Sequence, residues 1–586
     1  MLGGSIVESQ ALRNYKLWLE DPYIDEETKK ELESIKDNKK EIEDSFFKDL
    51  EFGTAGLRGI IGAGPNRINK YVVRKTTQGL ANYINTKGEE AKARGVVIAY
   101  DSRRMSREFA EEAACVLAGN DIKVYLFDDI SPTPELSFAI RYLNCISGIV
   151  ITASHNPAEY NGYKVYWEDG AQISTEQAQE ITDEIDCVND LRSIKMLGKE
   201  LAKEKGLLLY LNEKIDNAYI EEVKKQSLRR DIVNKVSDEF KIVFTPLHGT
   251  GNKPVRRVLT EIGFKNVIVV PEQEQPDPEF STVKQPNPED KDAFELAIEL
   301  ARKENANLII GTDPDCDRVG AVVKDDTGEY IVLTGNQTGA LLINYILETL
   351  KKNNNLPKNG VIIKTIVTSE MGANIAKRYG VETINTLTGF KYIGEKIKQF
   401  EKTDEKTFLF GYEESYGYLA GTYARDKDAV VASMLICEMV AYYYTKGMNL
   451  YDVLMDLYSR YGYFLEDLKS IKLEGKDGLD KIDSIMEYFR TTTIDDIGGR
   501  KVLYIEDYKS QRRIYMDGSN NVENIELPKA NVVKFILENE GWVCLRPSGT
   551  EPKLKLYGGV KGSNLKESKE ELAEIIAWVE EKIQEI

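Results

Sequence analysis

One order of elements recurs three times along the chain and limits the folds that it can adopt. An apolar run of strand length is followed by a helical stretch that ends at glycine, a second short strand, another helix and a third strand that ends in a polar loop. The third strands are expected at Gly148–Thr152, Asn307–Gly311 and Thr407–Phe410. Continuous apolar strands that alternate with helices are typical of parallel sheets covered on both faces. We therefore expect three similar α/β domains with mixed or parallel sheets.

The remaining strands of the repeat complete this pattern. They are expected at Gly95–Tyr100, Lys123–Phe127, Lys241–Thr245, Val267–Val270, Val361–Val367 and Val381–Asn385. The first helix of each repeat stops at Gly119, Gly263 or Gly380, which is typical of a left-handed helix C-cap. Ligands of such sheets bind outside the carboxyl ends of the strands. The polar loops are therefore expected to contribute to one shared cleft.

The rest of the chain has a different character. Short strands, including Gly541–Leu545, precede a Lys/Glu-rich helix from Leu565, which predicts a smaller C-terminal α+β domain. The first 45 residues or so are expected to form charged surface helices. A chain of 586 residues has room for roughly four domains. We expect them at residues 1–206, 207–318, 319–462 and 463–586, around a central cleft.

Charge and residue counts argue against several classes of protein. The chain has 78 Lys+Arg against 97 Asp+Glu, a net charge of −19, whereas a nucleic-acid binder needs a basic footprint. The six cysteines form no Cys-x-x-Cys pair and there are two histidines, so a disulfide framework or zinc cluster is not expected and a reducing cytoplasm fits. The start of the chain does not look like a signal peptide. The apolar stretch Ala429–Tyr444 is shorter than the ~20 residues of a membrane span and is expected to be a buried helix.

Three aspartates at alternate positions directly follow the third strand of the second repeat. Asp313, Asp315 and Asp317 would repel one another unless a cation lay among them. Oxygen ligands suit Mg²⁺, which also takes phosphate oxygens. An EF-hand is excluded because Arg318 and Lys324 stand where its glycine and glutamate would be. The alternative is a solvated acidic turn, which the preceding apolar strand makes the weaker interpretation.

The loop after the third strand of the first repeat contains a serine with polar neighbours. Ser154 is followed by His155 and Asn156, and Lys164 comes soon after. A free serine hydroxyl is a poor nucleophile without a base. If the resting form is phosphoserine, the serine is a leaving group, and Lys164 could exchange the proton of an attacking sugar hydroxyl. The alternative is that Ser154 and Asn156 only cap a turn.

Two further loops carry groups suited to a sugar phosphate. Glu413 and Ser415 follow the third strand of the last repeat, and a carboxylate with a hydroxyl is the usual equipment for holding sugar hydroxyls. Near the C-terminus, an arginine, two hydroxyl side chains and a glycine turn could form an anion nest. These residues are Arg546, Ser548, Gly549 and Thr550. Exposed turns without function are the alternative for both loops.

Two other stretches are less informative. The glycine-rich run Phe52–Gly59 contains Arg58 but lacks the Gly-Lys-Ser/Thr of a nucleotide P-loop. No such P-loop occurs anywhere in the sequence, so use of ATP is not supported. His248 lies in a turn rich in glycine and threonine and is expected to be a turn or capping residue rather than a catalytic one.

The four polar loops together resemble those of the α-D-phosphohexomutase superfamily, which includes phosphoglucomutases and phosphomannomutases. The resemblance runs in matching order from about Phe52 to Tyr557 and is closest to the long phosphoglucomutase/phosphopentomutase branch. It implies a mutase of the isomerase class that acts in carbohydrate metabolism. In that family a phosphoserine donates to a sugar monophosphate, and a bisphosphate intermediate returns its other phosphate to the serine.

The resemblance also implies roles for individual residues. Ser154 would be the phosphoserine, with Lys164 as the acid/base and Arg58 and His155 as further catalytic residues. One Mg²⁺ per chain would be held by Ser154, Asp313, Asp315 and Asp317. The implied substrate-binding residues are Arg318, Thr388, Gly389, Lys391, Glu413, Ser415, Lys427, Arg546, Ser548, Gly549 and Thr550.

One departure concerns the sugar loop, where Tyr412 stands at the position of a glycine in many phosphoglucomutases. Glucose phosphate is the expected substrate, ribose or deoxyribose phosphate the second candidate and mannose phosphate the third. A phosphatase with Asp313 as nucleophile and Asp315 as acid is one alternative from another class, and a non-catalytic sugar-phosphate sensor is another. The expected partners are a small sugar phosphate and a sugar 1,6-bisphosphate activator, with no nucleic acid and no membrane. The chain would be a cytoplasmic monomer or dimer.

Overall fold

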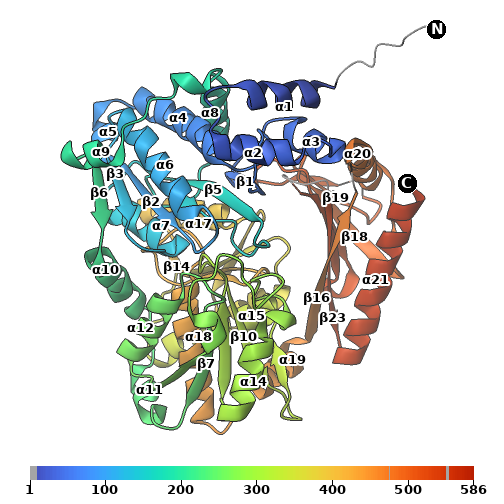
Figure 1. Ribbon diagram of the computed structural model, residues 1–586. Coiled ribbons are helices and arrows are strands. Elements are labelled where there is room, and N and C mark those ends of the chain that lie inside the picture. The colour runs from blue at the N-terminus through green and yellow to red at the C-terminus, as the bar shows by residue number, and fades with distance from the viewer. Residues whose placement is uncertain (1–8, 474, 520, 549–552) are drawn as a thin grey trace. The chain divides into compact units, whose positions relative to one another are not determined.

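The computed structural model describes residues 9–473, 475–519, 521–548 and 553–586 (Figure 1). The chain divides into two compact units. The first unit comprises Met1–Val322, Gly394–Gln399 and Gly417–Tyr442, and the second comprises Val323–Ile393, Phe400–Tyr416 and Tyr443–Ile586. The four expected domain boundaries stay predictions, because this division separates two units rather than four domains.

The first unit contains a six-stranded mixed sheet with the order β1-β5-β4-β2-β3-β6. β2, β3, β4 and β6 are parallel, whereas β5 is antiparallel to both β4 and β1. The strands are β1 (Leu57–Ile60), β2 (Val96–Tyr100), β3 (Val124–Phe127), β4 (Ser147–Ile151), β5 (Tyr160–Trp167) and β6 (Leu208–Leu211). The apolar runs predicted β2, β3 and β4 to within one residue at each end, because strands buried on both faces are apolar throughout.

Helices cover both faces of this sheet. One face shares an apolar core mainly with three helices, and alternate strand residues such as Ile98 and Ile149 belong to it. These helices are α4 (Lys70–Thr86), α6 (Ser106–Gly119) and α8 (Thr175–Asp186). α7 (Thr133–Tyr142) packs on β2 and β4 and contributes no residue to that core, which places it on the other face. The other helices around this sheet are α5 (Glu89–Arg94) and α9 (Lys199–Glu204).

One of the three expected left-handed caps is wrong. Gly263 and Gly380 have positive φ values of 121° and 73°, as predicted. Gly119 instead is the last residue of α6 and does not have a positive φ. A Cβ at Gly119 would lie 2.6 Å from the carbonyl oxygen of Lys195. Glycine is therefore needed there for close packing of two backbones.

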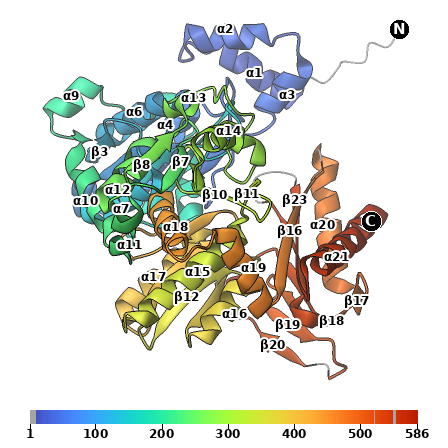
Figure 2. The same ribbon diagram turned by 90° about the horizontal axis from the view of Figure 1, so that it is seen from below.

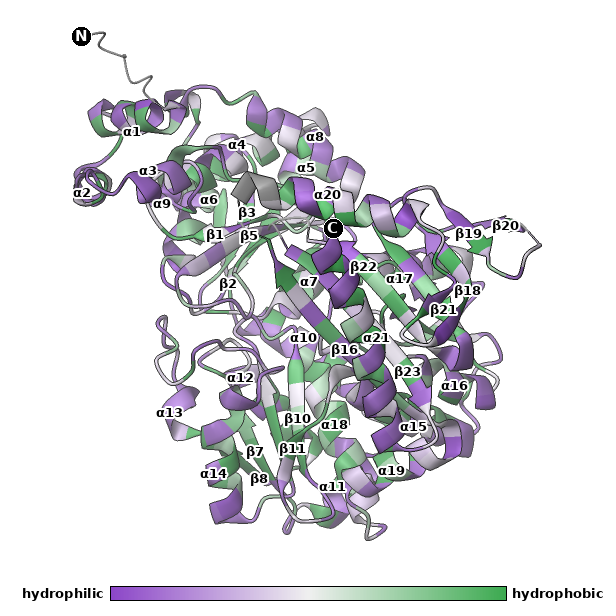
Figure 3. Ribbon diagram, turned by 90° about the vertical axis from the view of Figure 1, so that its right-hand side faces the viewer, coloured by the Kyte–Doolittle hydropathy of each residue, from purple (hydrophilic) through white to green (hydrophobic). Residues whose placement is uncertain are grey.

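A second sheet in the first unit has the same arrangement of parallel strands followed by an antiparallel one. Within the unit its order is β10-β9-β7-β8, with β7, β8 and β9 parallel and β10 antiparallel to β9. The strands are β7 (Lys241–Thr245), β8 (Asn266–Val269), β9 (Leu308–Thr312) and β10 (Val319–Lys324), and they are largely hydrophobic (Figure 3). Its helices are α10 (Glu213–Lys224), α11 (Arg230–Val236), α12 (Asn252–Ile262), α13 (Pro271–Glu274) and α14 (Glu295–Glu304). Both sheets thus add an antiparallel strand directly after the third parallel strand, which the repeat did not predict.

The N-terminal helices are more than a charged surface layer. α1 (Gln10–Glu20), α2 (Glu26–Ser34) and α3 (Lys39–Phe46) enclose a small apolar core of their own. Tyr15 and Phe46 form its centre, with ring centroids 5.7 Å apart in an edge-to-face arrangement. This explains why the charged stretch folds.

The second unit contains a parallel sheet and an antiparallel one. The parallel strands are β12 (Gly360–Thr365), β13 (Glu382–Thr386) and β14 (Thr407–Glu413), with β12 between the other two. α15 (Gly335–Lys352) packs against α16 (Glu370–Arg378), and both lie near β12 (Figure 2). α15 also packs on β14, and α16 packs on β13. Three more helices lie in or reach into this unit, α17 (Phe390–Thr403), α18 (Ala429–Tyr444) and α19 (Leu450–Tyr461). The short strands are β11 (Tyr330–Val332) in this unit and β15 (Gly417–Leu419) in the first.

The C-terminal sheet has the order β16-β23-β22-β21-β18-β19-β20, and its pairs are antiparallel. The strands are β16 (Tyr463–Lys472), β17 (Asp496–Ile497), β18 (Arg500–Asp507), β19 (Arg512–Tyr515), β20 (Val522–Asn524), β21 (Val533–Leu537), β22 (Trp542–Pro547) and β23 (Lys553–Gly562). α20 (Gly475–Thr491) and α21 (Leu565–Glu585) share the apolar core of this sheet. The expected fold class, three α/β domains followed by an α+β domain, is confirmed.

The apolar stretch at residues 429–444 forms α18, as the sequence predicted. Nearly all of its side chains are buried. Among the described residues, no helix combines the length and the apolar character that crossing a membrane requires.

Candidate functional site

Ser154 lies in the connection between β4 and β5, here called the serine loop (residues 152–159). Its φ is +54°, in the left-handed region that non-glycine residues rarely adopt. Its amide donates to Thr152 Oγ1 at 2.8 Å, and its own Oγ donates to Asp313 Oδ2 at 2.8 Å. Ser154 is buried. The structure therefore brings the candidate serine directly against the candidate metal ligands.

The three aspartates lie in the equivalent connection between β9 and β10, here called the metal loop (residues 313–318). One carboxylate oxygen from each lies within 4.8 Å of the others, and all three side chains are buried. Asp313 Oδ1 accepts the amides of Asp317 and Arg318 at 3.1 and 3.0 Å. The loop thus curls around one of its own carboxylates.

Two buried oxygens of this cluster have no hydrogen-bond donor among the described residues. They are Asp315 Oδ1 and Asp317 Oδ1. A buried carboxylate oxygen without a donor destabilises the fold unless a cation compensates it. Crowded oxygen ligands with free lone pairs fit a divalent cation of the Mg²⁺ type. The residues present therefore fit the metal that the sequence predicted.

Two lysines neutralise part of the cluster's charge. Lys164 Nζ lies 2.9 Å from Asp315 Oδ2 and 3.9 Å from Asp317 Oδ2. Lys427 Nζ lies 3.0 Å from Asp317 Oδ2 and 3.1 Å from Asp426 Oδ1. The antiparallel register of β5, which pairs Lys164 with Val150 of β4, carries Lys164 back to this cluster.

Burial and mutual repulsion set the protonation of the aspartates. Burial, with the charges of Asp315 and Asp317, holds the pKa of Asp313 well above its usual range. Burial also raises the pKa of Asp317. Burial acts in the same direction on Asp315, but Lys164 and hydrogen bonds outweigh it and lower the pKa of that carboxyl. The three carboxyl groups therefore differ in pKa although they share one buried cluster.

Arg58 and His155 flank the serine. Arg58, on β1, donates from Nη1 to Asn156 Oδ1 at 3.1 Å. His155 Nδ1 lies 3.2 Å from Ser154 Oγ. Burial, with the nearby charges of Arg318 and Arg58, holds the pKa of His155 well below its usual value, so the ring is neutral at pH 7.

Sequence reasoning missed several buried polar residues around the site. Asp101 and Arg103 directly follow β2, and Thr133 Oγ1 donates to Asp315 Oδ2 at 3.0 Å. Tyr166 donates from its hydroxyl to Asp426 Oδ2 at 2.7 Å. Asp101 and Arg103 could have been predicted from the sequence, because polar residues that follow a parallel strand lie at the ligand-binding edge of the sheet.

The turn that contains His248 supports the metal loop. His248 Nδ1 donates to the carbonyl oxygen of Gln275 at 2.9 Å, so Nε2 accepts from Thr282 Oγ1 at 2.8 Å. Both ring nitrogens are therefore used in the fold. A Cβ at Gly249 would lie 2.5 Å from Pro314 Cα, which explains why glycine follows the histidine.

The expected sugar loop follows β14, and its candidate residues Glu413 and Ser415 belong to the second unit. Glu413 Oε1 accepts the amide of Gly389 at 2.9 Å, and Gly389 has a φ of +121° that favours glycine. Lys391 Nζ lies 4.8 Å from the ring centroid of Tyr392. Thr388 Oγ1 is buried without a hydrogen-bond partner among the described residues. Ser415 is half-buried.

Tyr412, the departure in the sugar loop, is fully buried. A Cβ at Gly339 would lie 2.3 Å from its ring, and a Cβ at Gly372 would lie 2.3 Å from its hydroxyl oxygen. It also stacks on Phe410, with centroids 5.9 Å apart. Tyr412 is therefore a packing residue of the second unit, and its presence leaves the adjacent Glu413 in place.

The expected phosphate loop is described only in part. Arg546 lies on β22 opposite Lys555 of β23, and its Nε is buried without a hydrogen-bond partner among the described residues. The amide of Ser548 donates to the carbonyl oxygen of Lys553 at 2.8 Å. Gly549 and Thr550 lie outside the described residues.

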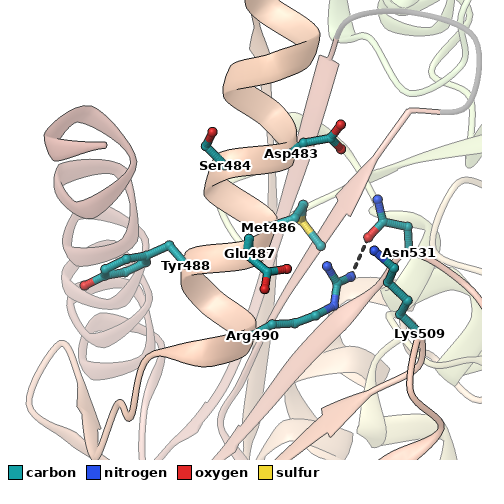
Figure 4. Close-up of a pocket in the computed structure, with 8 residues that line it drawn as sticks. All are labelled: Asp483, Ser484, Met486, Glu487, Tyr488, Arg490, Lys509 and Asn531. Atoms are coloured by element: carbon teal, nitrogen blue, oxygen red, sulfur yellow. Dashed lines mark hydrogen bonds between the residues drawn. The ribbon is translucent and has the colours of Figure 1, made fainter.

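A groove of about 700 Å³ on the second unit lies apart from these residues (Figure 4). Its lining mixes both charges, including Asp483, Glu487 and Lys509. Arg490 binds Asn531 across the groove and pairs with Asp507 at 2.9 Å. None of the candidate catalytic residues lines it, so its size alone does not mark the reaction site.

Comparisons with known proteins match nearly the whole chain to one family. The Phosphoglucomutase/phosphomannomutase alpha/beta/alpha domains I, II and III match residues 49–190, 217–328 and 334–461, and the C-terminal domain matches residues 512–577. A Phosphoglucomutase of Staphylococcus haemolyticus is 40% identical over 531 residues, covering 90% of this chain and 94% of the relative. A Phosphoglucomutase of Staphylococcus epidermidis is 41% identical over 519 residues, covering 88% of this chain and 92% of the relative.

Solved structures share the fold at lower identity. A phosphoglucomutase/phosphomannomutase family protein from Burkholderia thailandensis has a TM-score of 0.61 at 18% identity, covering 91% of this chain and 97% of that chain. The open form of the phosphoprotein pp63/parafusin, a phosphoglucomutase from Paramecium, has a TM-score of 0.65 at 18% identity, covering 91% of this chain and 95% of that chain.

Proposed function

The chain belongs to the phosphoglucomutase/phosphomannomutase family, and from this membership we propose that it interconverts glucose 1-phosphate and glucose 6-phosphate. It is then a phosphosugar mutase, an intramolecular phosphotransferase of the isomerase class. The observation that carries this proposal is the 2.8 Å distance from Ser154 Oγ to Asp313 Oδ2 in a buried cluster of carboxylates. The cysteines are free thiols, which suits the reducing cytoplasm and supports a cytoplasmic location.

Ser154 is proposed to carry the phosphoryl group between substrate and product. A bound Mg²⁺, held by Asp313, Asp315, Asp317 and the phosphorylated Ser154, would neutralise charge on the transferring group. Lys164 would exchange the proton of the attacking sugar hydroxyl, and Arg58 would stabilise the transferring phosphoryl group. The neutral His155, 3.2 Å from Ser154 Oγ, would orient the serine hydroxyl when it is regenerated.

Substrate recognition is assigned to the remaining candidates. Glu413 and Ser415 would hydrogen-bond to sugar hydroxyls, and the phosphate that is not transferred would lie on the loop that begins at Arg546. The other proposed contacts are Arg318, Thr388, Gly389, Lys391, Lys427, Ser548, Gly549 and Thr550. The similarity to relatives named Phosphoglucomutase supports glucose phosphate as the substrate, and the buried Tyr412 places the departure from the usual loop sequence inside the fold.

Two measurements test the proposal. The intact mass of the wild type, after incubation with glucose 1,6-bisphosphate, should include a species heavier by one phosphate, and Ser154→Ala should lack it. A coupled assay should give the highest kcat/KM for glucose 1-phosphate among the 1-phosphates of glucose, mannose and ribose. A wild type that never carries phosphate contradicts the role of Ser154, and release of inorganic phosphate instead of isomerised sugar would indicate a phosphatase.

A further inference from the structure

Arg103 lies at the carboxyl end of β2, and its side chain is fully buried. Its Nη1 donates to the carbonyl oxygens of Pro157 and Tyr160 at 2.8 and 3.1 Å. Its Nη2 donates to those of Ser154, at 2.6 Å, and Asn156. Four carbonyl groups in and next to the serine loop therefore converge on one guanidinium, whose planar fork can donate to all of them at once.

Arg103 is itself held in place. Its Nε lies 3.3 Å from Asp101 Oδ2, which also accepts the Thr152 hydroxyl at 2.7 Å. Thr152 Oγ1 in turn accepts the amide of Ser154 at 2.8 Å. The guanidinium stacks on the ring of Phe280, 4.9 Å from its centroid. These contacts close a ring that begins and ends at Ser154.

The backbone of Ser154 explains why such a ring is present. A non-glycine residue at a φ of +54° persists only where its surroundings impose that conformation. We propose that Arg103, with Asp101 and Thr152, is the positioning residue that holds the serine loop so that Ser154 Oγ meets the metal-binding cluster. The inference rests on the proposed function of Ser154 and adds a residue with no assigned role in it.

Arg103 acts through the loop rather than on the substrate. All four Nη protons are used by carbonyl oxygens. The Nε makes no hydrogen bond among the described residues, but it is buried and lies 3.3 Å from Asp101 Oδ2. The guanidinium therefore presents no exposed donor to a phosphate. The expected signature of its loss is a lower kcat with little change in KM, because recognition groups stay in place while the serine is misplaced.

The test compares Arg103→Met with Arg104→Met, a matched change at the adjacent and half-exposed arginine, which pairs with Glu279 at 3.0 Å. For Arg103→Met we expect kcat to fall about 100-fold with KM for glucose 1-phosphate within about threefold. Phosphorylation of Ser154 by glucose 1,6-bisphosphate, followed by intact mass, should slow by a similar factor. Arg103→Lys should give an intermediate loss, since an ammonium cannot reproduce the fork. Arg104→Met should stay within about twofold of the wild type.

A second variant guards against misfolding, because Arg103→Met leaves the Asp101 carboxylate buried without its cation. Thr152→Val changes no charge but removes the acceptor of the Ser154 amide. It should lower kcat about tenfold and speed hydrogen exchange in the serine-loop peptide in the absence of substrate. Wild-type kcat and exchange in folded Thr152→Val would overturn the inference, as would a folded Arg103→Met with wild-type kcat. An inactive wild type would refute the proposed function, while the exchange experiment would still test the positioning.

Discussion

The serine loop and the metal loop occupy equivalent places in their sheets but are held in different ways. Each joins the third parallel strand to an antiparallel one and contains a non-glycine residue at a φ of +54°, Ser154 in one and Cys316 in the other. The serine loop depends on Arg103, which lies 51 positions before Ser154 in the chain. The metal loop instead curls around its own Asp313.

The two loops therefore differ in which residues determine the backbone conformation and which provide the charge for cation binding. The metal loop takes its shape from short-range hydrogen bonds to the Asp313 carboxylate. One oxygen of each of its other carboxylates, Asp315 Oδ1 and Asp317 Oδ1, lacks a hydrogen-bond donor among the described residues and can bind a cation. Inside the serine loop the Thr152 hydroxyl accepts the Ser154 amide, but the main-chain carbonyl groups in and next to the loop are held from outside by a buried arginine. Changes inside the metal loop should therefore affect cation binding first, whereas changes around the serine loop should affect the transfer step.

The largest effect is expected from Asp317→Asn. Asp317 contributes to the shape of the loop mainly through its amide, which donates to Asp313 Oδ1, so the fold should survive while a charged cation ligand is lost. We expect activity at 1 mM Mg²⁺ to fall at least about 100-fold and to recover in part at higher concentrations. A titration of activity against Mg²⁺, with a thermal-shift titration beside it, measures both effects.

The exposed Asp326 offers a control for this change, since Asp326→Asn removes the same charge outside the metal loop. It should leave the Mg²⁺ titration unchanged. A stabilisation by Mg²⁺ that survives undiminished in Asp317→Asn would show that the cluster does not hold the cation.

Gly249→Ala tests whether the metal loop also needs outside support. The new Cβ would lie 2.5 Å from Pro314 Cα and 2.7 Å from its carbonyl oxygen, so backbone would have to move. We expect a destabilisation of about 1–3 kcal/mol and activity lower by about 10-fold or more. Gly198→Ala is the control, because nothing lies within 4 Å of its added Cβ. Equal melting temperatures for the two variants would mean that the metal loop tolerates displacement.

Thr133→Val should produce a smaller change. It removes the hydroxyl that donates to Asp315 Oδ2 but keeps the Thr133 amide that donates to the Asp315 carbonyl oxygen. Loss of such an outer contact should weaken apparent Mg²⁺ affinity about 10-fold, with kcat at saturating Mg²⁺ within about twofold. Thr182→Val, whose hydroxyl binds Ala178 within α8, is the matched control. A lower kcat at saturation would instead place Thr133 in the transfer step.

The smallest effect on activity is expected from His248→Gln. Both ring nitrogens of His248 bind the fold, so the change should destabilise the protein by about 1–3 kcal/mol through unsatisfied partners. Activity per folded molecule should stay within about twofold. Chemical denaturation and active-site titration measure the two quantities separately. A tenfold fall in kcat with unchanged stability would make His248 a catalytic residue and contradict the structural role.

The strands and the polar loops were predictable because their signals are local. β7 was predicted with its observed limits, and the acidic run at Asp313 pointed to a cation before any contact was known. β5 and β10 were not predicted, because buried strands without alternation after a loop give no periodic signal. The placement of Lys164 against Asp315 therefore could not be derived, since it depends on the register of β5.

The contacts of Arg103 illustrate the same limit. Its place after β2 could have indicated the ligand-binding edge of the sheet, but its four carbonyl partners follow from the path of a loop far along the chain. Gly119 is a further example. A glycine at a helix end predicts a left-handed cap, and only the close approach of Lys195 reveals the other reason for glycine.

The recognition of the serine loop by Arg103 has a consequence for how this protein can change. Arg103 contacts only main-chain oxygens of the loop, which every amino acid possesses. Apart from Thr152, which accepts the Ser154 amide, and Asn156, which accepts from Arg58, side chains of the loop can therefore be exchanged without altering these bonds. The loop backbone can therefore keep its conformation while its side chains change. A library that varies the serine loop but keeps Asp101, Arg103 and Thr152 would be a way to alter the reaction.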